Sequence, residues 1–214
     1  MEVNRNISVS ENPNDLDNDI VMITRDIKPG FAKLRCLNSQ KNKLYFGYGL
    51  IQTHEGLFLS TSEWITRRRH NWWPSSDLIQ DIVQDGCLLV PFGNPYSQES
   101  HLQWRISFSL AETKLVHSFN HNQYLCYGLL KLFLKHAINS NTQVKDSLCS
   151  YFLKTSLFYC IEKENIVWNQ ENLLDCFSSC LGRLITWIWD ENSLNYFIKN
   201  NNKIEGKICK SNSK

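Results

Sequence analysis

The sequence lacks the long apolar runs and the strong charge imbalance that mark several classes of protein. None of its uninterrupted apolar stretches approaches the about 18 residues of a membrane-spanning helix, so we expect no membrane partner. The formal net charge of +2 does not by itself indicate a nucleic-acid binder. Residues 1–19 are polar and acidic, so no secretory signal peptide is predicted there. We expect an intracellular protein of the cytoplasm, with the nucleus as the alternative compartment.

Recognisable catalytic motifs are also missing. The sequence contains no P-loop, no dinucleotide fingerprint and no Gly-x-Ser-x-Gly elbow. It also lacks a Gly-Ser turn followed by paired acids, which would hold two metal ions for nucleotidyl transfer. Asp15, Asp17 and Asp19 precede a predicted strand without such a turn, and Glu55 and Glu63 are the remaining candidates for one leftover carboxylate. We therefore predict no catalytic residue and no metal ligand.

Cysteine, in contrast, is plentiful, with eight residues. A small secreted scaffold would pair them in disulfides, but Cys176 and Cys180, among others, fall within apolar helical patterns. That placement predicts reduced, buried thiols. His117, His121 and Cys126 suggest a zinc site, yet no second cysteine pair lies nearby to complete four ligands.

The apolar pattern changes from strand-like to helical along the chain. A hydrophobic content of 42% with 12% aromatic residues is enough for a folded core. Residues 1–19 are predicted to be a disordered head. Strands are predicted at 20–23, 31–37 and 87–91, with further apolar runs at 44–50 and 57–59 and a helix from Ser75 or Ser76 to Gly86.

The second half is predicted to be helical. Ser109 and Glu112 form a capping-box pattern at a helix start. Helices are predicted at about 126–138, 147–163 and 169–189, where apolar residues recur at i, i+3 and i+4. Beyond residue 198 the chain is polar and is expected to fray. The fold class is therefore α+β, with a mixed core followed by an all-helical lobe.

Two short blocks place a ring, a hydroxyl and a cation close together in sequence. At a helix start, Ser150 can hydrogen-bond a base edge or a phosphate while Tyr151 stacks on a base. The planar guanidinium of Arg105 suits a base edge or a phosphate. The alternatives are a core tyrosine, an arginine paired with a carboxylate, and lysines that simply face water at Lys135 and Lys154.

A basic run, Arg67-Arg68-Arg69, lies between Trp64 and Trp72. Cations among aromatic side chains are typical of contact with a double-stranded nucleic acid. A solvated face of three arginines is the alternative interpretation.

Taken in order, the motifs of the second half resemble one known family. Its members are the Mab-twenty-one-like (male-abnormal-twenty-one-like) proteins, which have a cyclic GMP–AMP synthase-like nucleotidyltransferase fold. The resemblance covers residues 100–200 well and 20–37 and 63–95 more loosely. The matching segments are Trp104–Ser109 with Glu112, Cys126–Lys135, Ser150–Phe158, Trp168–Phe177 and Asn195–Ile198.

The resemblance implies a nucleotidyltransferase fold of two lobes, the first shortened here. It implies a partial nucleotidyltransferase-like core over 20–100 and a Mab-twenty-one-like helical lobe over 101–200. That lobe would be helix–hairpin–helix, helix-two-turn-helix-like, and residues 201–214 would form a flexible tail. The Gly-Ser turn is absent, and 56–60 stands without an aspartate where the strand bearing the third acid is expected.

The resemblance also implies roles for individual residues. Tyr151 matches a base-stacking tyrosine and Ser150 its hydroxyl neighbour, Lys135 a phosphate-contacting lysine, and Arg105 an arginine that reaches a base. Mg²⁺ with ATP or GTP would belong to an active full-length form, and no other cofactor is implied. The zinc-binding arrangement of the family's DNA-sensing member, His-x5-Cys-Cys-x6-Cys, is absent, so zinc-dependent DNA sensing is not implied.

The resulting hypothesis is a catalytically incomplete family member whose helical lobe retains nucleotide binding. One alternative is a fragment of an active cyclic GMP–AMP synthase-like nucleotidyltransferase that senses nucleic acid in innate immunity. Another alternative is a scaffold protein that binds no ligand and acts through protein interactions or in development. The sequence does not indicate its protein partner.

Overall fold

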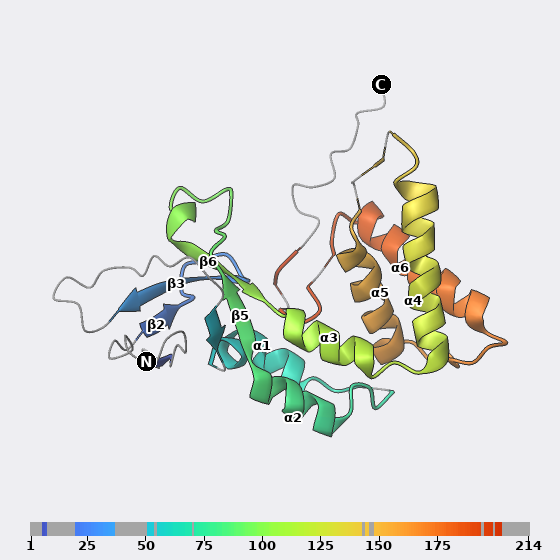
Figure 1. The fold of residues 1–214 in the computed structure, drawn as a ribbon, viewed down its shortest axis with the longest axis horizontal. Helices are drawn as coiled ribbons and strands as arrows, with labels where there is room; N and C mark the ends of the chain where they lie inside the picture. Colours follow the sequence, from blue (N-terminus) through green and yellow to red (C-terminus); the bar gives the residue numbers. More distant parts are fainter. Residues whose placement is uncertain are drawn as a thin grey trace. The chain divides into compact units, whose positions relative to one another are not determined.

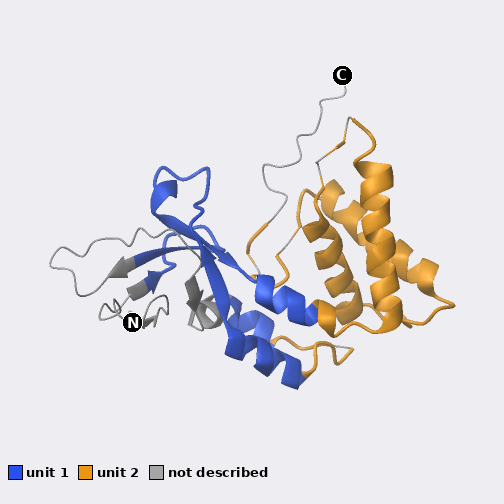
Figure 2. Ribbon diagram, viewed as in Figure 1, with its two compact units in different colours: residues 1–66, 76–115 blue, residues 67–75, 116–214 orange. Residues whose placement is uncertain are grey.

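The chain divides into two compact units, residues 1–66 with 76–115 and residues 67–75 with 116–214 (Figure 2). The predicted boundary at residue 100 therefore differs from this division, in which residues 101–115 belong to the first unit. The computed structural model describes residues 6–7, 20–36, 51–53, 55–69, 71–142, 144–145, 148–193, 195–198 and 200–202.

The first unit is built on an antiparallel sheet of six strands in the order β1-β2-β3-β6-β5-β4 (Figure 1). The predicted strands at 20–23, 31–37 and 87–91 are confirmed. The strand bounds are β1 (Asn6–Ile7), β2 (Ile20–Ile23), β3 (Phe31–Cys36), β4 (Ile51–Thr53), β5 (Cys87–Val90) and β6 (Gln103–Ser107). Because β1 pairs with β2, residues 6–7 of the predicted disordered head are in fact ordered; the rest of 1–19 lies outside the described residues.

Burial alternates along the central strands of this sheet. Ala32 and Leu34 of β3 are fully buried, as are Trp104 and Ile106 of β6, whereas Arg105 is exposed. Successive side chains of a strand point to opposite faces, so one face packs on the core and the other carries Arg105.

Three α-helices begin in this unit, namely α1 (Glu55–Thr66), α2 (Ser76–Asp85) and α3 (Ser109–His117), with a short 3-10 turn, η1 (Ser100–Leu102). The apolar run 57–59, predicted as a strand, lies within α1, so that prediction was wrong; short apolar runs suit a helix equally well. The run 44–50 lies outside the described residues. Gly86 ends α2 as predicted, with a positive φ of 72° and its N–H donating to the Ile82 carbonyl.

The second unit is helical, and its predicted helices are confirmed (Figure 1). The helices are α4 (His121–Phe133) with its continuation η2 (Leu134–Ile138), a π-helical turn, then α5 (Ser150–Lys163) and α6 (Leu173–Trp189). Helix α4 begins earlier than predicted because Asn120 and Gln123 form a capping box. Ser109, predicted to cap α3, is instead its first residue. No helix among the described residues is long and apolar enough to cross a membrane.

Helix α5 lies at the centre of the second unit. Apart from Lys154, every residue from Phe152 to Glu162 is buried. The Ser156 hydroxyl donates to the Cys180 carbonyl of α6 over 2.7 Å, which joins the two helices. The predicted burial of the helical cysteines is confirmed for four described residues of α4, α5 and α6, namely Cys126, Cys160, Cys176 and Cys180. Their reduced state stays a prediction.

The described residues of the segment after α6 are folded and held by hydrogen bonds. The Asn195 side-chain oxygen accepts hydrogen bonds from the N–H groups of Phe197 and Ile198, at 2.8 and 3.0 Å. The Asn195 N–H donates to the Asn201 carbonyl over 2.9 Å. Asn201, the first residue of the predicted flexible tail, is buried, so the ordered segment is longer than predicted; residues 203–214 lie outside the described residues.

Candidate functional site

The first turn of α5 carries two of the predicted nucleotide-binding residues. Ser150 is exposed and Tyr151 is half-buried, with its ring edge-on to Phe152 at a centroid distance of 5.9 Å. Cys149, the residue before the helix, makes no side-chain capping hydrogen bond. The Ser150 hydroxyl lies in the N-terminal turn of α5. The peptide dipoles at a helix N-terminus favour a negatively charged group such as a phosphate.

Lys135 lies in the π-helical turn η2 and is exposed. The Ser140 hydroxyl donates to its carbonyl over 3.3 Å, which closes the end of the turn. Single π-turns within α-helices are frequent at functional sites. The apolar spacing of the sequence gave no signal for this irregular turn.

Arg105 lies in β6 of the first unit, and its guanidinium stands 5.2 Å from the centroid of the exposed Phe92 ring. In the ladder it is opposite Phe31 of β3 and Val90 of β5. A cation over an aromatic ring gains a modest stabilisation when exposed. The predicted alternative, an arginine paired with a carboxylate, is not what the described contacts of Arg105 show.

The predicted nucleotide-binding residues are thus divided between the two units. Lys135, Ser150 and Tyr151 belong to the second unit, on η2 and α5, and Arg105 belongs to the first. Nucleotide binding by these four residues stays a prediction.

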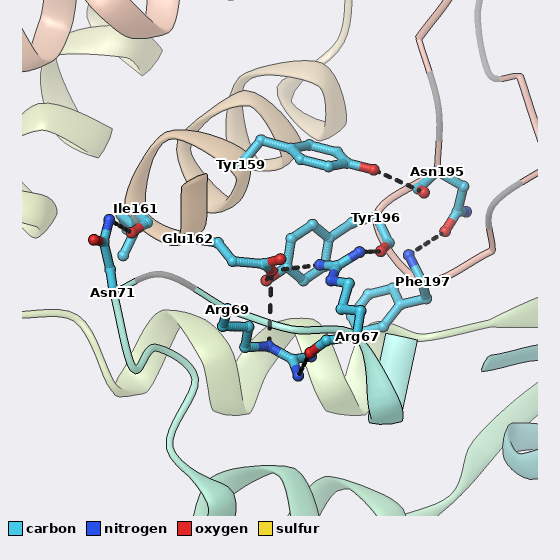
Figure 3. A network of polar contacts seen from close by, with 9 residues as sticks. All are labelled: Arg67, Arg69, Asn71, Tyr159, Ile161, Glu162, Asn195, Tyr196 and Phe197. Carbon is cyan, nitrogen blue, oxygen red and sulfur yellow. Dashed lines mark hydrogen bonds and ion pairs between the residues drawn. The ribbon is translucent and has the colours of Figure 1, made fainter. Parts of the chain in front are cut away.

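The second unit also contains a buried ionic network centred on Glu162 of α5 (Figure 3). The Glu162 side chain is 1% exposed. Its carboxylate accepts hydrogen bonds from the Arg67 guanidinium and, over 2.5 Å, from the Tyr196 hydroxyl. The Arg69 Nε lies 4.0 Å from the same oxygen. One carboxylate therefore joins residues that are distant in sequence.

Arg67 makes several further contacts within this network. It donates to the Tyr196 carbonyl over 3.1 Å, and its guanidinium lies 4.5 Å from the Tyr196 ring and 5.8 Å from the Tyr159 ring. The Tyr159 hydroxyl in turn donates to the Asn195 carbonyl. The network thus fixes the segment after α6 against α5.

Burial and charge act in opposite directions on the groups of this network. Burial disfavours the charge on Arg67, but Tyr196 and Glu162 together raise the pKa of its guanidinium. Burial lowers the pKa of Arg69 and raises that of the Tyr196 hydroxyl well above its usual value, where Glu162 adds to the rise. Tyr196 therefore stays protonated as the donor to Glu162.

The structure changes the interpretation of the basic run. Arg67 and Arg69 face a buried carboxylate, whereas Arg68 is exposed. Neither predicted interpretation of the run, a nucleic-acid patch or a solvated face, included an ion pair with a buried carboxylate. Glu162, the single acid of α5, follows the apolar run 157–161 and was the one available signal, because a buried charge needs a partner.

The rest of the segment 67–75 packs on the same helix. The Asn71 amide donates to the carbonyls of Ile161 and Glu164, at 2.9 and 2.6 Å. The Trp73 ring lies 5.8 Å from the ring of Phe158 and donates from its indole N–H to the Ser118 hydroxyl. These contacts satisfy the end of α5 and indicate a structural role for this segment.

We find no cluster of potential metal ligands in the part of the chain that the structure describes. There, no three His, Cys, Asp or Glu side chains converge closely enough to hold an ion.

Comparison with known proteins agrees with this architecture. Residues 122–212 match the family model described as the Mab-21 protein HhH/H2TH-like domain. The chain is also similar to cyclic GMP-AMP synthase of Mus musculus, with 26% identity over 159 residues, which are 66% of this chain. It spans 31% of the length of that relative. The family-model match covers α4 from its second residue, together with α5 and α6, so the helical unit is similar to the Mab-21 HhH/H2TH-like domain.

Proposed function

We propose that the helical unit of this chain binds a nucleotide through Tyr151, Ser150 and Lys135. The observation that carries the proposal is the contrast within α5. From Phe152 to Glu162 the helix is core apart from Lys154, whereas its first turn presents an exposed Ser150 beside the half-buried Tyr151. That turn offers a hydroxyl and a ring to a ligand.

Each side chain supplies a different kind of contact. The Tyr151 ring stacks on a base, the Ser150 hydroxyl bonds a base edge or a phosphate oxygen, and the Lys135 ammonium attracts phosphate as a point charge. The relative's name, cyclic GMP-AMP synthase, suggests guanine and adenine nucleotides as the ligand class.

The proposed activity is binding without nucleotidyl transfer. Transfer of this kind depends mainly on charge stabilisation by metal ions held on carboxylates. The sequence has no Gly-Ser turn with paired acids, and the described residues offer no cluster of metal ligands. Binding then rests on hydroxyl, ring and ammonium groups alone.

Titration calorimetry with ATP and with GTP, each with and without Mg²⁺, tests the proposal. We expect measurable heat for at least one nucleotide and its loss on Tyr151→Ala. Tyr96→Ala, which removes an exposed tyrosine of the first unit, is the matched control and should bind as the wild type does. Absence of heat with every nucleotide would support the ligand-free scaffold instead.

The second candidate function is nucleotidyl transfer itself, favoured by the similarity to a named synthase over 159 residues. Incubation of the chain with ATP, GTP and Mg²⁺, with and without double-stranded DNA or RNA, distinguishes the two. We expect no cyclic dinucleotide by mass spectrometry. Detection of a cyclic dinucleotide would contradict the proposal of binding without transfer. It would support the alternative of an active enzyme that senses nucleic acid.

A further inference from the structure

Helix α6 exposes an apolar stripe on its outer face. Leu174, Ile185 and Trp189 are 73%, 63% and 81% exposed, while Cys180 and Leu184 on the inner face are buried. At 100° per residue the three exposed side chains fall on one side of the helix. Contiguous exposed apolar surface of this kind marks an interaction site more often than chance.

Small residues form a recess in the middle of this stripe. Ser178 and Gly182 are exposed between Leu174 and Ile185. A Cβ added at Gly182 would meet no other atom within 4 Å. The α6 face, defined by these residues and Trp189, therefore has apolar side chains on both sides of a low centre.

The α6 face is flanked by negative charge. Asp175, Asp190 and Glu191 are exposed near its two ends. The single basic residue of the helix, Arg183, is bound to Glu164. A partner that fits this face combines apolar side chains with positive charge.

The outer face of α4 has that combination. Leu125 and Leu132 are exposed two turns apart, and Gly128 lies exposed between them with no atom within 4 Å of an added Cβ. The sequence from His121 to Ile138 contains no Asp or Glu, and its lysines, among them Lys131, are exposed. The α4 face, defined by these residues, is apolar and basic.

We propose that the α4 face of one copy of this chain packs on the α6 face of a second copy. One of the two leucines of α4 enters the recess at Ser178 and Gly182, and Ile185 covers Gly128. Lys131 of α4 then stands near the acids at one end of the α6 face. The contact is heterologous, because each copy offers two different faces, so it extends to chains or rings of copies.

Sedimentation equilibrium of the full chain over a range of concentrations tests the contact. The average mass of the wild type is expected to rise with concentration. Leu132→Asp disables the α4 face and Ile185→Lys disables the α6 face, so each variant alone should remain a monomer. An equimolar mixture should form a one-to-one complex, because each variant retains the face that the other has lost.

Tyr96→Asp, at an exposed aromatic residue of the first unit, is the control and should associate as the wild type does. Thermal unfolding confirms that the variants, all at exposed positions, remain folded. A wild type that is monomeric throughout, whether or not it binds vesicles or another protein, would overturn the proposal. A mixture that stays monomeric would overturn it too, because an intact α4 face and an intact α6 face would then be present without pairing.

Discussion

The Tyr196 hydroxyl donates a hydrogen bond to the Glu162 carboxylate over 2.5 Å, and both side chains are almost completely buried. Glu162 belongs to α5, Tyr196 to the segment after α6, and Arg67 adds the segment 67–75 to the same carboxylate. In a low dielectric each of these charges depends on the others for its stabilisation. One buried acid in the last turn of α5 therefore joins three segments of the second unit.

Removing that acid should destabilise the chain strongly. Glu162→Gln is expected to lower the free energy of unfolding by about 3–5 kcal/mol, because Arg67 and Arg69 are left without their carboxylate. Urea unfolding monitored by tryptophan fluorescence measures the loss. Glu164→Gln is the matched control: its ion pair with Arg183 is partly exposed, so the change should be about 1 kcal/mol or less. Equal losses in the two variants would contradict a buried ionic centre.

The Tyr196–Glu162 contact also predicts a dependence of stability on alkaline pH. The pKa of Tyr196 is raised in the folded chain by burial and by Glu162, whereas an unfolded tyrosine titrates near about 10. The folded state therefore holds this proton more tightly, so its contribution is complete below about pH 10 and is lost as the pH rises further.

Tyr196→Phe should remove this part of the pH dependence. Stability of the wild type should fall above about pH 10 with an extra slope of up to about 1.4 kcal/mol per pH unit relative to the variant. Urea unfolding at several pH values measures both slopes. Tyr124→Phe, at an exposed tyrosine, should retain the wild-type slope. Parallel curves for wild type and Tyr196→Phe would show that Tyr196 is not the group responsible.

Most secondary structure was predictable because single elements leave a periodic pattern. Alternation at 31–36 and 103–107 gives strands, and apolar i, i+3, i+4 spacing at 173–189 gives α6. The run 57–59 was misassigned because three apolar residues do not distinguish a strand from a helix. The early start of α4 depended on the side chains of Asn120 and Gln123, which an apolar pattern does not reveal.

The ionic network was not predictable because its members are far apart in the sequence. Arg67 and Glu162 are 95 positions apart, and nothing local links them. Local motifs placed Ser150, Tyr151 and Lys135 on helices, which is where the structure has them. Whether one ligand contacts all three side chains is a separate question, which a sequence pattern does not answer.

Asn195 is expected to hold the segment after α6 in its folded form. Asn195→Ala leaves the buried N–H groups of Phe197 and Ile198 without their acceptor, which should cost about 1–3 kcal/mol. Hydrogen exchange of residues 195–202 should become faster. Asn165→Ala, at an exposed asparagine, should leave both stability and exchange unchanged. Unchanged exchange in Asn195→Ala would mean that packing of Tyr196 alone fixes the segment.

Lys135 provides a charge-specific test of nucleotide binding. Lys135→Ala should weaken nucleotide binding by up to about tenfold at low salt, about 1.4 kcal/mol, because it removes a positive charge proposed to contact phosphate. The difference from the wild type should shrink as salt is added, since screening weakens the contact that the wild type retains. Lys145→Ala, at another exposed lysine of the same unit, lowers the net charge equally and should change affinity by less than about twofold. Equal weakening by the two variants would indicate a general charge effect and would contradict a specific phosphate contact at Lys135.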